Sequence, residues 1–95
     1  MNNQEILKIL KTDLQINVEA YDVYLGNLIE LARAAIEKEG IVLDDTSVNH
    51  GMLVEAYAAY LYRKRREEQA TMPRSLRYAL NNELFAQKGR RKSDG

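Results

Sequence analysis

The sequence predicts an all-α fold, a small bundle of about four helices, two long and two short, followed by a basic flexible C-terminal tail. Three observations predict this fold. Apolar residues recur every three or four positions in several segments, as one buried face of a helix requires. The 95 residues fit one compact domain. The apolar fraction of 45% is that of a chain that folds rather than of a disordered one.

The first part of the chain predicts one short helix and one long helix. The short helix spans about residues 3–13 and the long one residues 18–39, because both have apolar residues at helical spacing. Asn17 is a candidate cap for the long helix, since its side chain can accept hydrogen bonds from unpaired amides. Gly40 stands where a left-handed residue is wanted after a helix end, because glycine has no Cβ to clash there.

Residues 40–51 predict a connecting loop rich in Asp, Thr, Ser and Asn. We interpret Asp44 and Asp45 as turn or capping residues, because the alternating carboxylates and distal Glu of a calcium loop are absent. The next helix, about residues 47–68, is apolar on nearly all sides. Such a helix must be buried, either as the centre of a small bundle or by a partner subunit, and periodicity does not decide between them.

Pro73 marks the first turn of a fourth helix, where proline is tolerated because its missing N–H would be unpaired in any case. Three leucines four residues apart form the apolar edge of this helix, which we expect to end near Gln87. Residues 88–95 have no apolar side chain to anchor them, so a mobile basic tail is expected. The predicted organisation is one helical domain over residues 1–87 and a disordered tail over 88–95.

The formal net charge of zero conceals a strong asymmetry between the two parts of the chain. Residues 1–60 carry four basic and ten acidic side chains, a net charge of −6. Residues 61–95 carry ten basic and four acidic side chains, a net charge of +6. Opposite charges on one chain suit head-to-tail contacts between copies.

The residue types present exclude several kinds of chemistry. No cysteine is present, which excludes disulfides, thiolate zinc sites and cysteine nucleophiles. His50 is the single histidine, expected in the loop, and no serine has evident His and Asp partners for a nucleophilic triad. We therefore expect no cofactor, no metal and no enzymatic activity. No apolar run approaches the ~20 residues of a membrane-spanning helix, and no secretory signal is visible, so a soluble protein is expected.

A basic run at residues 63–66 follows three tyrosines, and this combination has two interpretations. It suits contact with a nucleic-acid backbone and stacking on bases. Equally, cations near a helix C-terminus complement the helix dipole, Glu67 and Glu68 offer i,i+4 partners, and tyrosines at helical spacing commonly pack in a core.

Two long stretches together resemble the head-tail connector proteins of tailed phages and prophages: YDVYLGNLIELARAAIEKEGIVLDD and MLVEAYAAYLYRKRREEQATMPRSLRYALNNELF. They cover most of the chain, and the most telling parts are residues 21–28, 39–41, 57–65 and 72–82 with Leu84 and Phe85.

The resemblance implies an all-helical structural protein of the virion. Such a protein docks below the portal as a ring, usually of twelve copies, and closes the head after DNA packaging. Its implied partners are copies of itself, the portal protein and a downstream tail or head-completion protein. Its implied location is the head–tail interface, after synthesis in the host cytoplasm. The family has no catalytic residues, so the resemblance carries over no residue-level site.

The charge pattern suggests where subunits meet. We hypothesise that the acidic helix of residues 18–39 in one subunit faces the basic region of residues 63–77 in its neighbour. The candidate subunit or portal contacts are Glu30, Glu37, Tyr57, Tyr60, Tyr62, Arg63, Arg65, Arg66, Arg74 and Arg77. Candidates for nonspecific contact with phosphates of the packaged DNA are Arg90, Arg91 and Lys92.

The competing hypothesis is a small helical nucleic-acid-binding regulator. Its reading helix would be the fourth, which carries Arg74, Arg77, Asn81 and Asn82. The pI of about 6.6 and the acidic first part argue against it, because such domains present a broad basic footprint. An enzyme is less favoured still, because the sequence shows no convergent set of polar groups.

Overall fold

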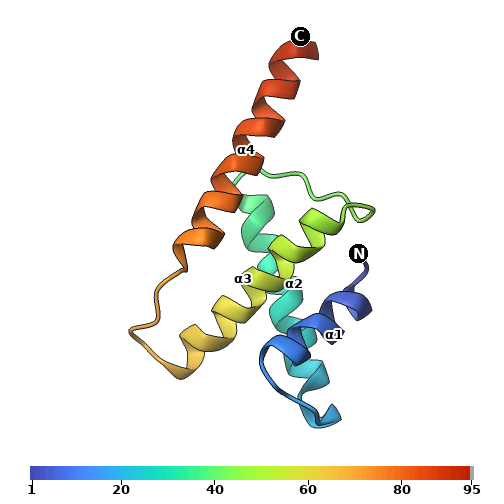
Figure 1. The fold of residues 1–95 in the computed structure, drawn as a ribbon, viewed down its shortest axis with the longest axis vertical. Coiled ribbons are helices and arrows are strands. Elements are labelled where there is room, and N and C mark those ends of the chain that lie inside the picture. Colours follow the sequence, from blue (N-terminus) through green and yellow to red (C-terminus); the bar gives the residue numbers. More distant parts are fainter. Residues whose placement is uncertain (95) are drawn as a thin grey trace.

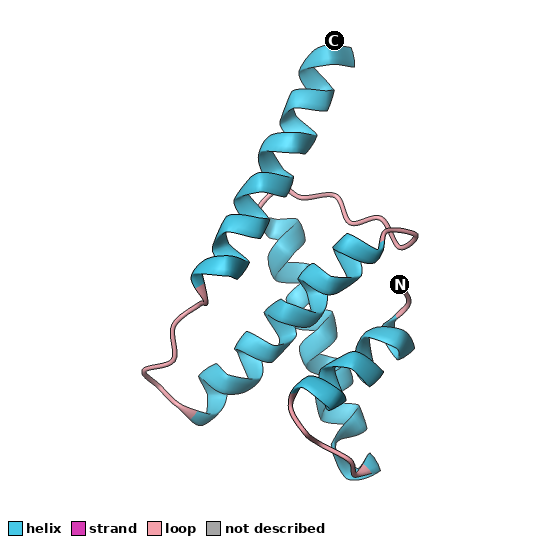
Figure 2. Ribbon diagram, viewed as in Figure 1, coloured by secondary structure: helices cyan, strands magenta, loops and turns pink. Residues whose placement is uncertain are grey.

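Helices alone make up the regular structure of residues 1–94, which the computed structural model describes, with side chains through residue 90 (Figures 1 and 2). In chain order they are α1 (Asn3–Asp13), the short 3-10 helix η1 (Glu19–Tyr21), α2 (Asp22–Lys38), α3 (Val48–Arg66) and α4 (Arg74–Asp94). No strand occurs within these residues. The predicted all-α fold of four helices is therefore confirmed.

Helix α3 is the centre of the bundle, and α1, α2 and α4 all pack against it (Figure 1). Its buried apolar residues Val54, Ala58 and Ala59 are small, which lets the neighbouring helices approach closely. The core they join comes mainly from α2, with Ile6 and Leu10 of α1 and the buried leucines of α4. Helix α3 therefore has the central position that one of the two interpretations expected, and additional burial by a partner subunit stays a prediction.

Two helix ends follow local signals in the sequence. At the start of α1, Asn2 and Glu5 form a reciprocal capping box. At the end of α2, Gly40 has φ +107°, the left-handed conformation predicted for it. Both positions confirm that the chain marks these boundaries locally.

The predicted cap at Asn17 is wrong. The chain first forms η1, capped by Val18 without a side-chain hydrogen bond, and α2 begins only at Asp22. The Asp22 carboxylate lies in the first turn of α2 and 2.7 Å from the Nζ of Lys11. A negative charge there complements the helix dipole, so an ion pair with α1 supports the start of α2 in place of the expected cap.

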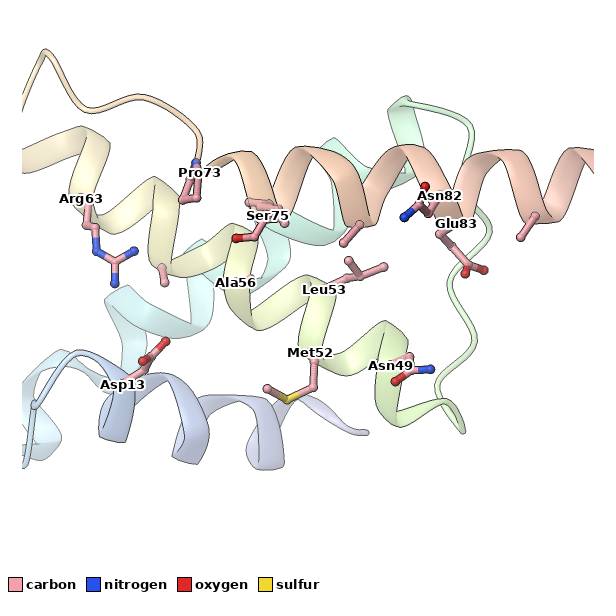
Figure 3. Close-up of a pocket in the computed structure, with 14 residues that line it drawn as sticks. Asp13, Asn49, Met52, Leu53, Ala56, Arg63, Pro73, Ser75, Asn82 and Glu83 are labelled. Carbon is pink, nitrogen blue, oxygen red and sulfur yellow. The ribbon is translucent and has the colours of Figure 1, made fainter.

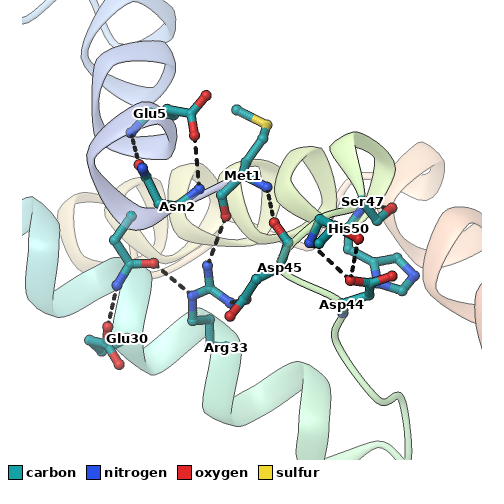
Figure 4. A network of polar contacts seen from close by, with 11 residues as sticks. Met1, Asn2, Glu5, Glu30, Arg33, Asp44, Asp45, Ser47 and His50 are labelled. Carbon is teal, nitrogen blue, oxygen red and sulfur yellow. Dashed lines mark hydrogen bonds and ion pairs between the residues drawn. The ribbon is translucent and has the colours of Figure 1, made fainter.

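A polar network ties the loop after α2 to the start of the chain (Figure 4). The guanidinium of Arg33 donates to Asn3 Oδ1 at 2.8 Å and to Asp45 Oδ1 at 3.1 Å. Asp44 accepts from the amide of Thr46 at 2.9 Å, which confirms its predicted turn role. Together these contacts hold the loop before α3.

His50 is not a loop residue, contrary to the prediction. It lies in the first turn of α3, and its amide donates to the Oγ of Ser47, the helix cap. Its Nδ1 accepts from the amide of Asp44 at 2.9 Å, and its Nε2 lies 2.8 Å from Glu83 Oε1 on α4. The imidazole therefore joins the loop, α3 and α4.

Helix α4 has the smallest contact with α3 of the three surrounding helices, and polar groups supplement its apolar edge. Arg77 donates two hydrogen bonds to the carboxylate of Glu39, at 2.8 and 3.0 Å. The buried amide of Gln87 bonds both the N–H and the C=O of Val42, each at 2.9 Å. These contacts fix the orientation of α4 against the end of α2 and the following loop.

Pro73 immediately precedes α4, and its carbonyl accepts from the amide of Arg77 at 3.1 Å. The predicted end of the helix near Gln87 is wrong, because Gln87 is a buried interior residue and α4 continues to Asp94. The predicted flexibility of residues 88–95 stays a prediction, and residue 95 lies outside the described residues.

Gly26, inside α2, and Gly40, in the turn after it, provide a matched test of backbone conformation. Gly40→Ala should destabilise the fold by about 1–2 kcal/mol, because an alanine is strained at positive φ. Gly26→Ala, inside α2 with no atom within 4 Å of the added Cβ, should instead stabilise it by about 0.5–1 kcal/mol. Thermal and urea unfolding would measure both. Equal effects of the two substitutions would contradict the left-handed assignment of Gly40.

Candidate protein-interaction surface

An open groove of about 750 Å³ lies between α3 and α4, with the end of α1 along one side (Figure 3). It is lined by Asp13 of α1, by Asn49, Met52, Leu53, Ala56, Ala59 and Arg63 of α3, and by Pro73, Ser75, Leu76, Ala79, Asn82, Glu83 and Ala86 of or next to α4.

The groove exists because α3 is apolar on more sides than the chain covers. Its inner faces meet α1 and α2, whereas Met52, Ala56 and Ala59 follow one another along the groove. The facing side of α4 carries Ser75, Ala79 and Ala86 in this hollow, and these residues are also small. A trough with apolar and small side chains on both walls accepts a helix or a row of large side chains. Its chemistry suits docking of a protein segment.

A pair of carboxyl groups marks one end of the groove. Asp13 lines it, and Glu55, only 4% exposed, lines the adjoining hollow between α1 and α3. Burial, together with a hydrogen bond and the negative charge of Asp13, raises the pKa of Glu55 to about 7, and Arg63 partly opposes this rise. Glu55 is buried whereas Asp13 is exposed. A positive charge added to that of Arg63 would stabilise both ionised groups.

Glu83 marks the other end of the groove (Figure 3). Partial burial alone would raise its pKa, but hydrogen bonds with Gln87 and His50 outweigh this effect and hold the pKa below its usual value. Its Oε1 also lies 3.4 Å from the guanidinium of Arg90. A carboxylate is therefore present at each end of the trough, and Arg63 lies among the lining residues as well.

The structure places the predicted basic run at the C-terminal end of α3. Arg63 lines the groove, whereas Arg65 lies over the ring of Tyr24 at 5.8 Å and Arg66 over the ring of Tyr62 at 4.5 Å. Among the three tyrosines before the run, Tyr62 therefore has one ring face covered by a cation of the same chain. The run thus supports the helix end and its neighbours within the chain.

The predicted tyrosines are partly buried against the core. Tyr57 and Tyr60 meet edge to face with ring centroids 5.8 Å apart, and Tyr62 lies 6.3 Å from Tyr24. This arrangement matches the core-packing interpretation.

The remaining candidates do not gather into one surface. Glu30 accepts from the side-chain amide of Asn3 and shares a shallow hollow with Arg65. Arg77 is paired with Glu39 of the same chain, so the hypothesised pairing of the acidic helix with the basic region is partly satisfied internally. Glu37 and Arg74 are exposed, as is Arg90. The side chains of Arg91 and Lys92 lie outside the described residues.

Sequence reasoning missed the groove and its carboxyl pair. The available signal was Glu55, the one charged residue inside the most apolar stretch of α3. Its partner Asp13 ends α1, a full 42 positions earlier, and spacing along the chain does not reveal that the two meet.

No group of three or more His, Asp or Glu side chains among the described residues is placed to hold a metal ion. No helix in that part of the chain is both long and apolar enough to cross a membrane. Comparison with protein-family models, with curated proteins and with solved structures found no match.

The buried Glu55 generates a prediction about pH. A carboxyl with a pKa of 4.5 when unfolded and about 7 when folded takes up a proton on folding, so stability should fall as pH rises between these values. Glu55→Gln removes the charge but keeps the shape and a hydrogen-bond donor toward Asp13. We expect it to stabilise the fold by about 1–2 kcal/mol at pH 8.5 and to have an effect near zero at pH 5.

Urea unfolding of both proteins across this pH range would measure the difference. Glu30→Gln is the control, because Glu30 is exposed on α2. A pH-independent gain from Glu55→Gln would contradict the raised pKa of Glu55.

Proposed function

We propose that the chain is a head-tail connector subunit of a tailed phage or prophage, a structural protein rather than an enzyme. It would form a ring between the portal and the tail and help to close the DNA-filled head. The ring of about twelve copies, the portal, and a downstream tail or head-completion protein are its proposed partners. This role requires no cofactor and no metal.

The observation that carries the proposal is the groove between α3 and α4. A small domain with an open trough of about 750 Å³, lined largely by apolar and small side chains, has a surface suited to contact with another protein. The sequence resemblance to connector proteins supplies the class of protein to which such a surface would belong.

The chain also has the polarity that a ring needs. Copies in a closed ring meet through two different surfaces, so that each contact joins one face of a subunit to another face of the next. The opposite net charges of residues 1–60 and 61–95 would favour contact between such unlike faces. Contact with the phosphates of DNA passing through the ring would involve the exposed Arg90 at the distal part of α4.

The regulator hypothesis is less well supported by the geometry. Of the four side chains that would read DNA, Arg77 is held by Glu39 and also donates to Asn81 at 3.3 Å. Asn82 lines the groove. The fourth helix therefore does not present these four residues as one free polar face.

Sedimentation of the purified protein, alone and mixed with the portal protein of the same phage, tests the proposal. We expect a ring-sized species, or co-sedimentation with the portal, and a weakening of either at high salt because opposite charges meet across the contact. A chain that stays monomeric and ignores the portal at every salt concentration would overturn the proposal. Binding to a DNA duplex at physiological salt in that case would favour the regulator.

A further inference from the structure

The outward face of α4 carries a second unusual surface. A single stripe runs along it at positions i, i+4, i+7, i+11 and i+14: Arg74, Tyr78, Asn81, Phe85 and Lys88. Tyr78 is 62% exposed and Phe85 72%, whereas the leucines that anchor α4 lie on its opposite face. Two large aromatic side chains two turns apart on the same exposed helix face are characteristic of a contact surface. We call these five residues the aromatic stripe.

The aromatic stripe and the groove match in length. The stripe spans 14 helical steps, about 21 Å at 1.5 Å per residue. On α3 the groove runs from Asn49 to Arg63, also 14 steps and about 21 Å. The protruding rings on one surface correspond to the small and apolar walls of the other, as large residues fit against small ones in helix packing.

The two surfaces also match in charge. A cation flanks the aromatic rings at each end of the stripe, Arg74 at one and Lys88 at the other. Asp13 lines the groove at one end, together with Arg63 and next to Glu55 of the adjoining hollow, and Glu83 lines it at the other end. The stripe therefore brings a cation to the carboxyl pair in either direction along the groove. Binding of a cation here is favourable, because its positive charge reduces the repulsion between the two acidic groups.

We infer that the groove of one copy of this chain takes the aromatic stripe of the next copy. Groove and stripe lie on different surfaces of the same molecule, so each copy offers one of each and the contact is head to tail. Repetition of such a contact closes into a ring when the rotation between copies allows it. The inference rests on the proposed ring and names the two surfaces that would join its subunits.

Two substitutions block one surface each. Phe85→Ser removes the most exposed ring of the stripe, and Met52→Arg, at a residue 43% exposed, places a charge in the groove. Each variant alone should lose self-association by about tenfold or more. Mixed in equal amounts, they should form a dimer and nothing larger, because one intact groove then meets one intact stripe. Sedimentation measures all of these species, and circular dichroism checks that each variant is folded.

Val23→Ser is the matched control, since Val23 is a 79% exposed apolar residue on α2, away from both surfaces. It should assemble as the unmodified chain does. Should Met52→Arg fail to fold, Ala86→Arg on the α4 wall replaces it, because Ala86 is exposed and lines the groove.

The outcomes separate this inference from the proposed function. If the unmodified chain forms rings and both blocking variants still do, the contact lies elsewhere and the connector proposal stands. If both variants are monomeric and their mixture gives no dimer, groove and stripe are not partners of each other and the inference is overturned. If the unmodified chain neither self-associates nor binds the portal, the inference and the proposed function fail together.

Discussion

Burial of α3 is the constraint on which the rest of the structure depends. Its sequence is apolar on nearly all sides, so every other helix is positioned by the need to cover it. Helices α1 and α2 do this closely, because Val54, Ala58 and Ala59 leave room for them. Helix α4 covers only part of the remaining side, and the groove is the part left open. The candidate interaction surface is therefore a direct consequence of how the core is built.

The attachment of α4 explains how one short chain can present two unlike contact surfaces. Polar contacts at Arg77, Glu83 and Gln87 supplement a narrow apolar edge and hold the helix at a fixed orientation. One apolar edge, with these polar contacts, is enough to attach α4 to the core. One flank of the helix is therefore left to border the groove, and its outer face carries Tyr78 and Phe85. A helix wrapped more fully into the core would offer neither surface.

Much of the fold was predictable from the sequence, because its signals are local. Apolar spacing identified all four helices, and Gly40 marked the end of α2. The errors concern contacts between distant segments. Asn17 does not cap α2, which begins at Asp22 beside Lys11 of α1. Helix α4 passes beyond Gln87, whose side chain bonds the backbone of Val42. The groove, with its pairing of Glu55 and Asp13, depends on the packing of three helices, and no local pattern encodes it.

Amide hydrogen exchange as a function of protein concentration tests most directly whether the groove and α4 form the contact between copies. In the monomer α4 should be the least protected of the four helices, since it has the smallest contact with α3. As the concentration rises and copies associate, protection should increase in α4 and in the groove-lining part of α3, with little change in α2. Assembly that protects α2 and leaves α4 unchanged would contradict this assignment.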